Sequence, residues 1–182
     1  MYFKEKGKAN TEKCVELAIK EARNRHIKHI VVATNSGYTG KLFQEATDLN
    51  IVCVTHAYGS KKPGENVMLQ ETVEELKSLG IKVLTTTHVL SGAERGISKK
   101  FGGVSPVEIM AHTLRMFGQG TKVCVEVSVM ALDTGLIPYG EEIIAVGGSA
   151  EGADTAVVIS PAHANNILDT KINEIICKPK NF

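Results

Sequence analysis

Small hydroxylated residues and glycines crowd into one short segment, ATNSGYTG, which runs from Ala33 to Gly40. It follows an apolar run, HIVV, and precedes KLFQEATDL, a stretch with helical character. Where a strand turns into a helix, the first helical amides lack partners and lie beside a partial positive charge, so a phosphate can satisfy them. Gly37 would let the backbone approach such an anion, and Ser36 and Thr39 would add hydroxyl donors. A capped turn with a glycine for tight packing fits the same residues.

Two further loops carry residues that could surround a phosphorylated ligand. The segment SGAERGISKKFGG contains Arg95, the best candidate cation because a guanidinium pairs with phosphate through two hydrogen bonds. We expect a mobile lid there, although a solvated surface loop has the same composition. The segment GGSAEGAD contains Gly148 and Ser149, whose amides could form an anion nest. Asp154 at its end could accept the hydroxyls of a ribose or ribityl chain, or could form an Asx turn.

Proton transfer near neutral pH would depend on three titratable side chains. His56 and His88 close the second and third predicted strands, where an imidazole can act as an acid or a base. Glu126 lies in an apolar segment, from which its carboxylate would enter the site or cap a neighbouring amide. Each of the three could instead be a hydrogen-bonded structural residue. We expect no metal site, because the histidines have no carboxylate partner at ligand spacing.

The first half of the chain alternates strand and helix patterns. Apolar, β-branched runs such as HIVVAT and IVCVTH are typical of buried strands. Their alternation with helical segments predicts a parallel sheet with right-handed crossovers. The predicted helices cover residues 11–25, 39–49 and 70–80, and the predicted strands cover residues 29–34, 51–56 and 81–87.

The second half begins with a strong helix start. Ser105 can cap this helix, Pro106 occupies its first turn and Glu108 completes a capping box, so we expect a helix to about residue 117. The segment 121–138 alternates valines as a strand would, but its length and its Gly-containing, Pro-terminated end favour a buried helix. Three short strands, EIIAV, TAVVIS and KINEII, complete the chain.

These elements predict one α/β domain over residues 1–182. We expect three layers: a mostly parallel sheet with helices on both faces and with the last strands antiparallel. A chain of this length buries roughly 70% of its unfolded surface, so it needs no disulfide or metal to fold.

Composition excludes several classes of partner. Lys and Arg number 21 against 20 Asp and Glu, so no strong field attracts nucleic acid or anionic membranes. Trp is absent and aromatic residues make up only 5%, which leaves few platforms for stacking bases. No apolar run approaches the roughly 20 residues of a membrane span. The four cysteines are scattered and the N-terminus is polar, which favours a reduced, cytoplasmic chain.

Two stretches resemble the C-terminal domain of pyruvate kinase. IVVATNSGYTGKLFQEA, with NIVCVTH after it, resembles the first strand, phosphate turn, helix and second strand of that domain. EIIAVGGSAEGADTAVVISP resembles its last loop and the flanking strands. Over its full length the chain is similar to a family of stand-alone archaeal and bacterial proteins that have this domain and no assigned function.

The resemblance implies a site for a phosphorylated ligand. In pyruvate kinases that bind a sugar-bisphosphate effector, the first loop holds a phosphate and the last loop closes over the sugar. Tyr38 stands where that family usually has Arg, so the same effector is not implied. Nor is kinase activity, because the catalytic barrel has no counterpart. The residues that match the phosphate turn are Thr34, Asn35, Ser36, Gly37 and Thr39, and those that match the closing loop are Gly147, Gly148, Gly152 and Thr155.

Three hypotheses of function follow. The first is binding of a small phosphorylated metabolite or mononucleotide at the carboxyl ends of the strands, with regulation as one role and flavin mononucleotide (FMN) or a sugar phosphate as ligands of suitable size. The second is an enzyme that acts on a phosphorylated small molecule with His and Glu proton transfer. The third is an interaction domain that forms a homo-oligomer without a ligand.

Overall fold

One seven-stranded sheet organises the computed structural model, which describes residues 1–182. The strand order is β1-β7-β6-β5-β2-β3-β4. Neighbouring strands are parallel except for β5 with β6 and β6 with β7, which are antiparallel. The strands are β1 (Tyr2–Glu5), β2 (His29–Ala33), β3 (Asn50–Val54), β4 (Lys82–Leu84), β5 (Ile143–Gly147), β6 (Thr155–Ser160) and β7 (Lys171–Asn181).

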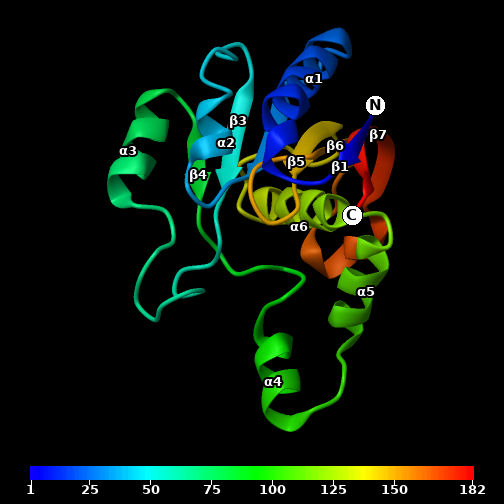
Figure 1. Ribbon diagram of the computed structural model, residues 1–182. Helices are drawn as coiled ribbons and strands as arrows, with labels where there is room; N and C mark the ends of the chain where they lie inside the picture. Colours follow the sequence, from blue (N-terminus) through cyan, green and yellow to red (C-terminus); the bar gives the residue numbers. More distant parts are fainter.

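Helices cover both faces of the sheet, so the predicted three-layer α/β fold is confirmed (Figure 1). One apolar core lies between the sheet and the helices α1 (Thr11–Asn24) and α3 (Gln70–Ser78). The other lies between the sheet and α6 (Gln119–Asp133). The central strands are buried on both sides, which explains their nearly continuous apolar sequences.

The helix predicted for the segment 121–138 is present as the buried α6, which begins at Gln119 and ends at Asp133. Almost all of its side chains are buried, so the valine alternation reflects burial all round the helix rather than a strand. Gly120 in its first turn allows a close approach to β6: a Cβ atom there would lie 2.1 Å from Thr155 Oγ1. The three predicted final strands are present as β5, β6 and β7, but β7 is not short: it has 11 residues.

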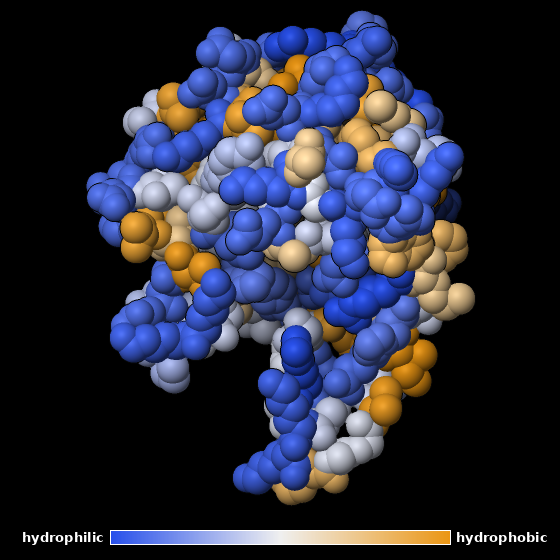
Figure 2. Space-filling view, viewed as in Figure 1, coloured by the Kyte–Doolittle hydropathy of each residue, from blue (hydrophilic) through white to orange (hydrophobic).

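A helical arm replaces the predicted lid loop, and that part of the prediction is wrong. The sequence AERGISKKF forms α4 (Ala93–Phe101). None of the side chains of α4 is buried. This helix leads to α5 (Pro106–Arg115), whose predicted capping box between Ser105 and Glu108 is present. The arm projects from the body of the molecule, with hydrophobic residues along its outer edge and a hollow on its inner side (Figures 1 and 2).

The predicted helix over residues 39–49 is also wrong. Only α2 (Tyr38–Lys41) is helical, and turns follow it, because the chain must bend to place Phe43 and Ala46 in the core. Strand β1, which pairs with β7 at the sheet edge, was not predicted. Two short 3-10 helices complete the fold, η1 (Lys8–Asn10) and η2 (Ala164–Asp169). No helix in the structure is both apolar enough and long enough to traverse a bilayer.

Two helical glycines give a matched test of the α6 packing. We expect Gly120→Ala to lower the free energy of unfolding by about 1–3 kcal/mol, because the new methyl group would collide with Thr155. Gly96→Ala, at an open site on α4, should instead be neutral or stabilise by up to about 1 kcal/mol. Urea unfolding at constant m-value measures both, and equal effects of the two substitutions would contradict the close approach of α6 to β6.

Candidate functional site

The loops that contain the predicted site residues all follow strands that end at the same edge of the sheet. Strands β2, β3, β4 and β5 are parallel, so their carboxyl ends meet there. The two sheet reversals at β6 and β7 bring the carboxyl end of β1 to the same edge. The hollow in Figure 2 lies at this edge, between the helical arm and the segment that follows β3.

The turn after β2 is held by its neighbour β3. Asn35 Oδ1 accepts a hydrogen bond from the His56 amide at 2.9 Å, and the buried Thr34 donates its amide to Val54 O at 2.9 Å. Gly37 has φ of 83° and lies against α3, where a Cβ atom would be 2.4 Å from Thr72 Cγ2. The glycine is therefore required for both its conformation and its packing.

The same turn leaves polar groups open. Ser36 is exposed, and its hydroxyl receives only a long 3.4 Å contact from the Tyr38 amide. The first backbone hydrogen bond of α2 runs from the Lys41 amide to Gly37 O, at 2.9 Å. The backbone amides before Lys41 therefore have no acceptor within the helix. Thr39 is buried beside them, and Tyr38 is 38% exposed.

Lys8 lies between this turn and the glycine-rich loop that follows β5. Its Nζ is 4.9 Å from the centroid of the Tyr38 ring and 4.0 Å from Glu151 Oε2. Lys8 was not among the predicted site residues, because the sequence pattern did not indicate β1, the strand that positions it. Lys8 supplies a positive charge next to Tyr38, the position where related phosphate turns have Arg.

Asp154 shapes the glycine-rich loop from inside. Its carboxylate is fully buried and accepts hydrogen bonds from the amides of Gly7 and Ser149, at 2.9 and 3.2 Å, and from Thr155 Oγ1 at 2.7 Å. The protein's own donors therefore use the acceptor positions of the Asp154 carboxylate. Asp154 and Thr155 stabilise the loop and do not face a ligand. A Cβ on Gly148 would be 2.3 Å from Gly152 O, so the loop folds back tightly on itself.

Ser149 is the exception in this loop. Its hydroxyl is buried and has no hydrogen-bond partner in the protein, and it is the one buried side-chain polar atom in this condition. A buried hydroxyl without a partner costs free energy, so this atom is a candidate contact for a bound molecule.

A second group of polar side chains lies where β3 and β4 end against α6. The rings of His56 and His88 meet edge to face, with centroids 5.3 Å apart. His88 Nδ1 is 3.3 Å from Glu126 Oε2, and the Leu90 amide donates to Glu126 Oε1 at 3.0 Å. Lys122 Nζ also pairs with Glu126 Oε2. The three predicted proton-transfer residues are therefore brought together around a buried ion pair.

Burial and charge set the protonation of this group. The Glu126 side chain is 3% exposed and that of Lys122 is 5% exposed. Burial opposes ionisation of Glu126, but His88 and Lys122 outweigh it and lower its pKa to about 2. Burial lowers the pKa of Lys122 despite the attraction of Glu126. Burial, followed by repulsion from His88, lowers the pKa of His56, so this imidazole is neutral at pH 7.

Lys122 was also missed in the sequence, although a signal was present. A lysine four residues before a glutamate, in an otherwise apolar helix, is the spacing of an intrahelical ion pair. Arg95 makes no contact with either group, although its charge is among those that lower the pKa of Lys122, after burial. It is exposed on α4 and forms no ion pair within the chain.

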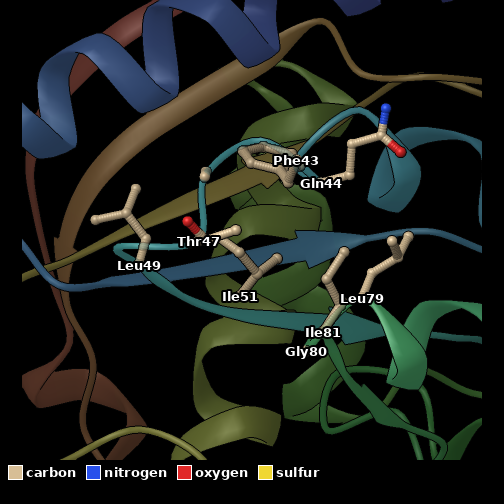
Figure 3. A pocket seen from close by; sticks show the side chains of 9 residues that line it. Phe43, Gln44, Thr47, Leu49, Ile51, Leu79, Gly80 and Ile81 are labelled. Carbon is tan, nitrogen blue, oxygen red and sulfur yellow. The ribbon is translucent and has the colours of Figure 1, made fainter.

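The cavities outside this edge have other characters. The pocket in Figure 3, of about 150 Å³, lies at the amino ends of β3 and β4 and is mostly apolar, with Phe43, Ile51 and Ile81 among its lining residues. A second cavity, of about 240 Å³, lies between the segment after β4 and the last turns of α6. No three His, Cys, Asp or Glu side chains are grouped so that they could hold a metal ion.

The buried ion pair makes stability depend on acid pH. Because the pKa of Glu126 falls from 4.5 to about 2 on folding, its stabilisation is complete above pH 4.5 and is lost as the pH falls to about 2. At about 1.4 kcal/mol per pKa unit, this loss is on the order of 3 kcal/mol. We expect the double variant Glu126→Gln/Lys122→Met to lose less stability over that interval than the wild-type protein, as measured by urea unfolding. Parallel pH curves for the two proteins would contradict the pairing.

Comparison with known proteins identifies the domain. Three solved pyruvate kinase structures, all from Cryptosporidium parvum and one in complex with ADP, are 16% identical to this chain. They align over 75%, 86% and 81% of it, with TM-scores of 0.38, 0.40 and 0.40. The chain spans only 20–24% of the length of those kinases. The family described as "Pyruvate kinase, alpha/beta domain" matches residues 12–159, and the chain belongs to this family.

Proposed function

We propose that this protein binds a small phosphorylated metabolite or mononucleotide at the carboxyl ends of its strands, in a regulatory or carrier role. The observation that carries the proposal is the position of Lys8 between the open Ser36–Thr39 turn and the glycine-rich loop. A phosphate there would meet hydroxyl groups, main-chain amides and an ammonium group, the combination that binds phosphate at helix starts. The unpaired hydroxyl of Ser149 is a further donor for the rest of the ligand.

The surroundings favour an anionic ligand of modest size. The segment that follows β3 carries the exposed Lys61 and Lys62, and α4 carries the exposed Arg95, Lys99 and Lys100. FMN and a sugar phosphate are the ligands that we would test first. The sheet edge has few aromatic side chains to stack on a flavin, which favours the sugar phosphate of the two.

Binding can be tested with one lysine and its matched control. We expect Lys8→Ala to raise the dissociation constant for a phosphorylated ligand on the order of tenfold or more, because it removes a charge-assisted contact. Lys6→Ala removes another exposed charge two residues away and should change little. Isothermal titration with FMN, ribose 5-phosphate, fructose 6-phosphate and inorganic phosphate measures both. Mass spectrometry of small molecules released from the native protein would identify a co-purified ligand.

A second candidate function, assembly into a homo-oligomer, is favoured by the helical arm. A nine-residue helix is marginal in water on its own, yet α4 buries none of its side chains. The arm also exposes a set of large apolar residues that a second copy could cover: Ile97, Phe101, Val104, Ile109, Met116 and Phe117.

The oligomeric state tests this candidate directly. We expect light scattering after size exclusion to show a multimer for the wild-type protein and a monomer for Phe101→Glu, because a charge in the interface would be desolvated. Leu168→Glu, at an exposed apolar residue on η2, is the control and should leave the mass unchanged. A wild-type protein that stays monomeric at high micromolar concentration would exclude assembly through the arm.

A further inference from the structure

The ion pair of Glu126 does more than stabilise α6. Its Oε2 atom faces both Lys122 and Nδ1 of His88, and Oε1 holds the Leu90 amide at 3.0 Å. The carboxylate thus holds the backbone two residues after His88 and faces one nitrogen of the His88 ring. When Nδ1 carries the proton and donates to Glu126, Nε2 is left unprotonated and free to accept a proton. The distance of 3.3 Å between Nδ1 and Oε2 is that of a close ion pair, and a small rotation of the ring would shorten it to a hydrogen bond.

The second imidazole extends this arrangement toward the phosphate turn. His56 lies edge to face with His88, and its amide is bonded to Asn35 Oδ1, one residue before Ser36. One connected set of contacts therefore runs from the buried ion pair to the turn proposed to hold phosphate. Burial and the neighbouring His88 lower the pKa of His56, which keeps it neutral and able to donate one hydrogen bond.

We infer that His88 is a general base, positioned by Glu126, that moves a proton on a phosphorylated carbonyl compound such as a sugar phosphate. This inference rests on the proposed function, since the Ser36–Thr39 turn would hold the phosphate while the carbonyl end reaches the two imidazoles. His88 and His56 are the catalytic residues in this scheme, and Glu126 is a positioning residue.

The proposed step is balanced without any further reactant. His88 Nε2 takes a proton from the carbon next to the carbonyl group, and the electron pair of that C–H bond forms a carbon–carbon double bond. The carbonyl π electrons move onto oxygen, where a hydrogen bond from neutral His56 stabilises the enolate, a role that a neutral imidazole can fill. Return of the proton, after exchange with solvent, restores the compound with no net redox change.

Deuterium exchange is the test of this step. The intact protein would be incubated in D2O with dihydroxyacetone phosphate, ribose 5-phosphate and fructose 6-phosphate, and deuterium at the carbon next to the carbonyl followed by NMR. We expect His88→Gln to slow exchange by about 10²- to 10⁴-fold, the usual contribution of a general base, while calorimetric binding of the same probe is retained. His112→Asn, at an exposed histidine on α5, should exchange at the wild-type rate.

The positioning role of Glu126 needs a readout beyond activity. The ¹⁵N chemical shifts of His88 report its tautomer, and we expect the proton on Nδ1 in the wild-type protein and a shift toward Nε2 in Glu126→Gln. If the single variant does not fold because Lys122 is left unpaired, Glu126→Gln/Lys122→Met removes both charges and gives the same comparison. An unchanged tautomer would overturn the positioning role.

The outcomes separate this inference from the proposed function. Binding of a probe without exchange by the wild-type protein, or exchange that survives His88→Gln, overturns the proton-transfer inference and leaves the binding proposal intact. Failure of FMN, the sugar phosphates and inorganic phosphate to bind at all overturns both.

Discussion

The candidate site depends on the contacts of one buried carboxylate, that of Glu126. An ionised group almost without solvent contact persists only when donors surround it, and here Lys122, the Leu90 amide and His88 do so. Lys122 lies one turn before Glu126 on α6, whereas Leu90 and His88 both lie on the segment that leaves β4. The need to satisfy one buried charge therefore fixes where the segment after β4 crosses the end of the sheet. The arm formed by α4 and α5 begins directly beyond that crossing.

The parallel strands impose a complementary constraint. Because β2 to β5 all end at one edge, each connection there must leave through a turn with unpaired backbone groups, and polar side chains gather to satisfy them. The amino ends of β3 and β4 have the opposite character, with the apolar pocket of Figure 3 between the turns that follow α2, the turn that follows α3, and the sheet. This polarity of the sheet, rather than the size of any cavity, is the argument for locating ligand chemistry at the carboxyl edge.

Much of the fold could be read from the sequence because its signals were local. The β-branched runs of β2 and β3 and the capping box at Ser105 specify their structures through side chains close together in the chain. The arm helix α4 was not predicted, because Gly96 and four charged residues give it the composition of a surface loop and it has no buried apolar face. The length of α2 was overestimated, because packing of Phe43 into the core, and not helix propensity, decides the path of the chain after Lys41.

The candidate site shows the same division. The sequence indicated the Ser36–Thr39 turn and the three proton-transfer candidates, because each follows or interrupts an apolar run. It could not assign Asp154 to the interior or bring Lys8 next to Tyr38, because those contacts join residues 147 and 30 positions apart in the chain. Long-range contacts of this kind depend on strand order, and strand β1, which sets them, is only four residues long.

The pairing of β1 with β7 has a consequence for the whole polypeptide. The first strand is parallel to the last, and the N-terminal ammonium donates to Ile176 O, only six residues before the C-terminus. Six extended residues reach about 20 Å, so a linker of similar length could join the two ends into a ring. Joining the two ends of this domain through such a linker and opening the chain at an exposed turn such as Gly64 would keep every strand neighbour it has now.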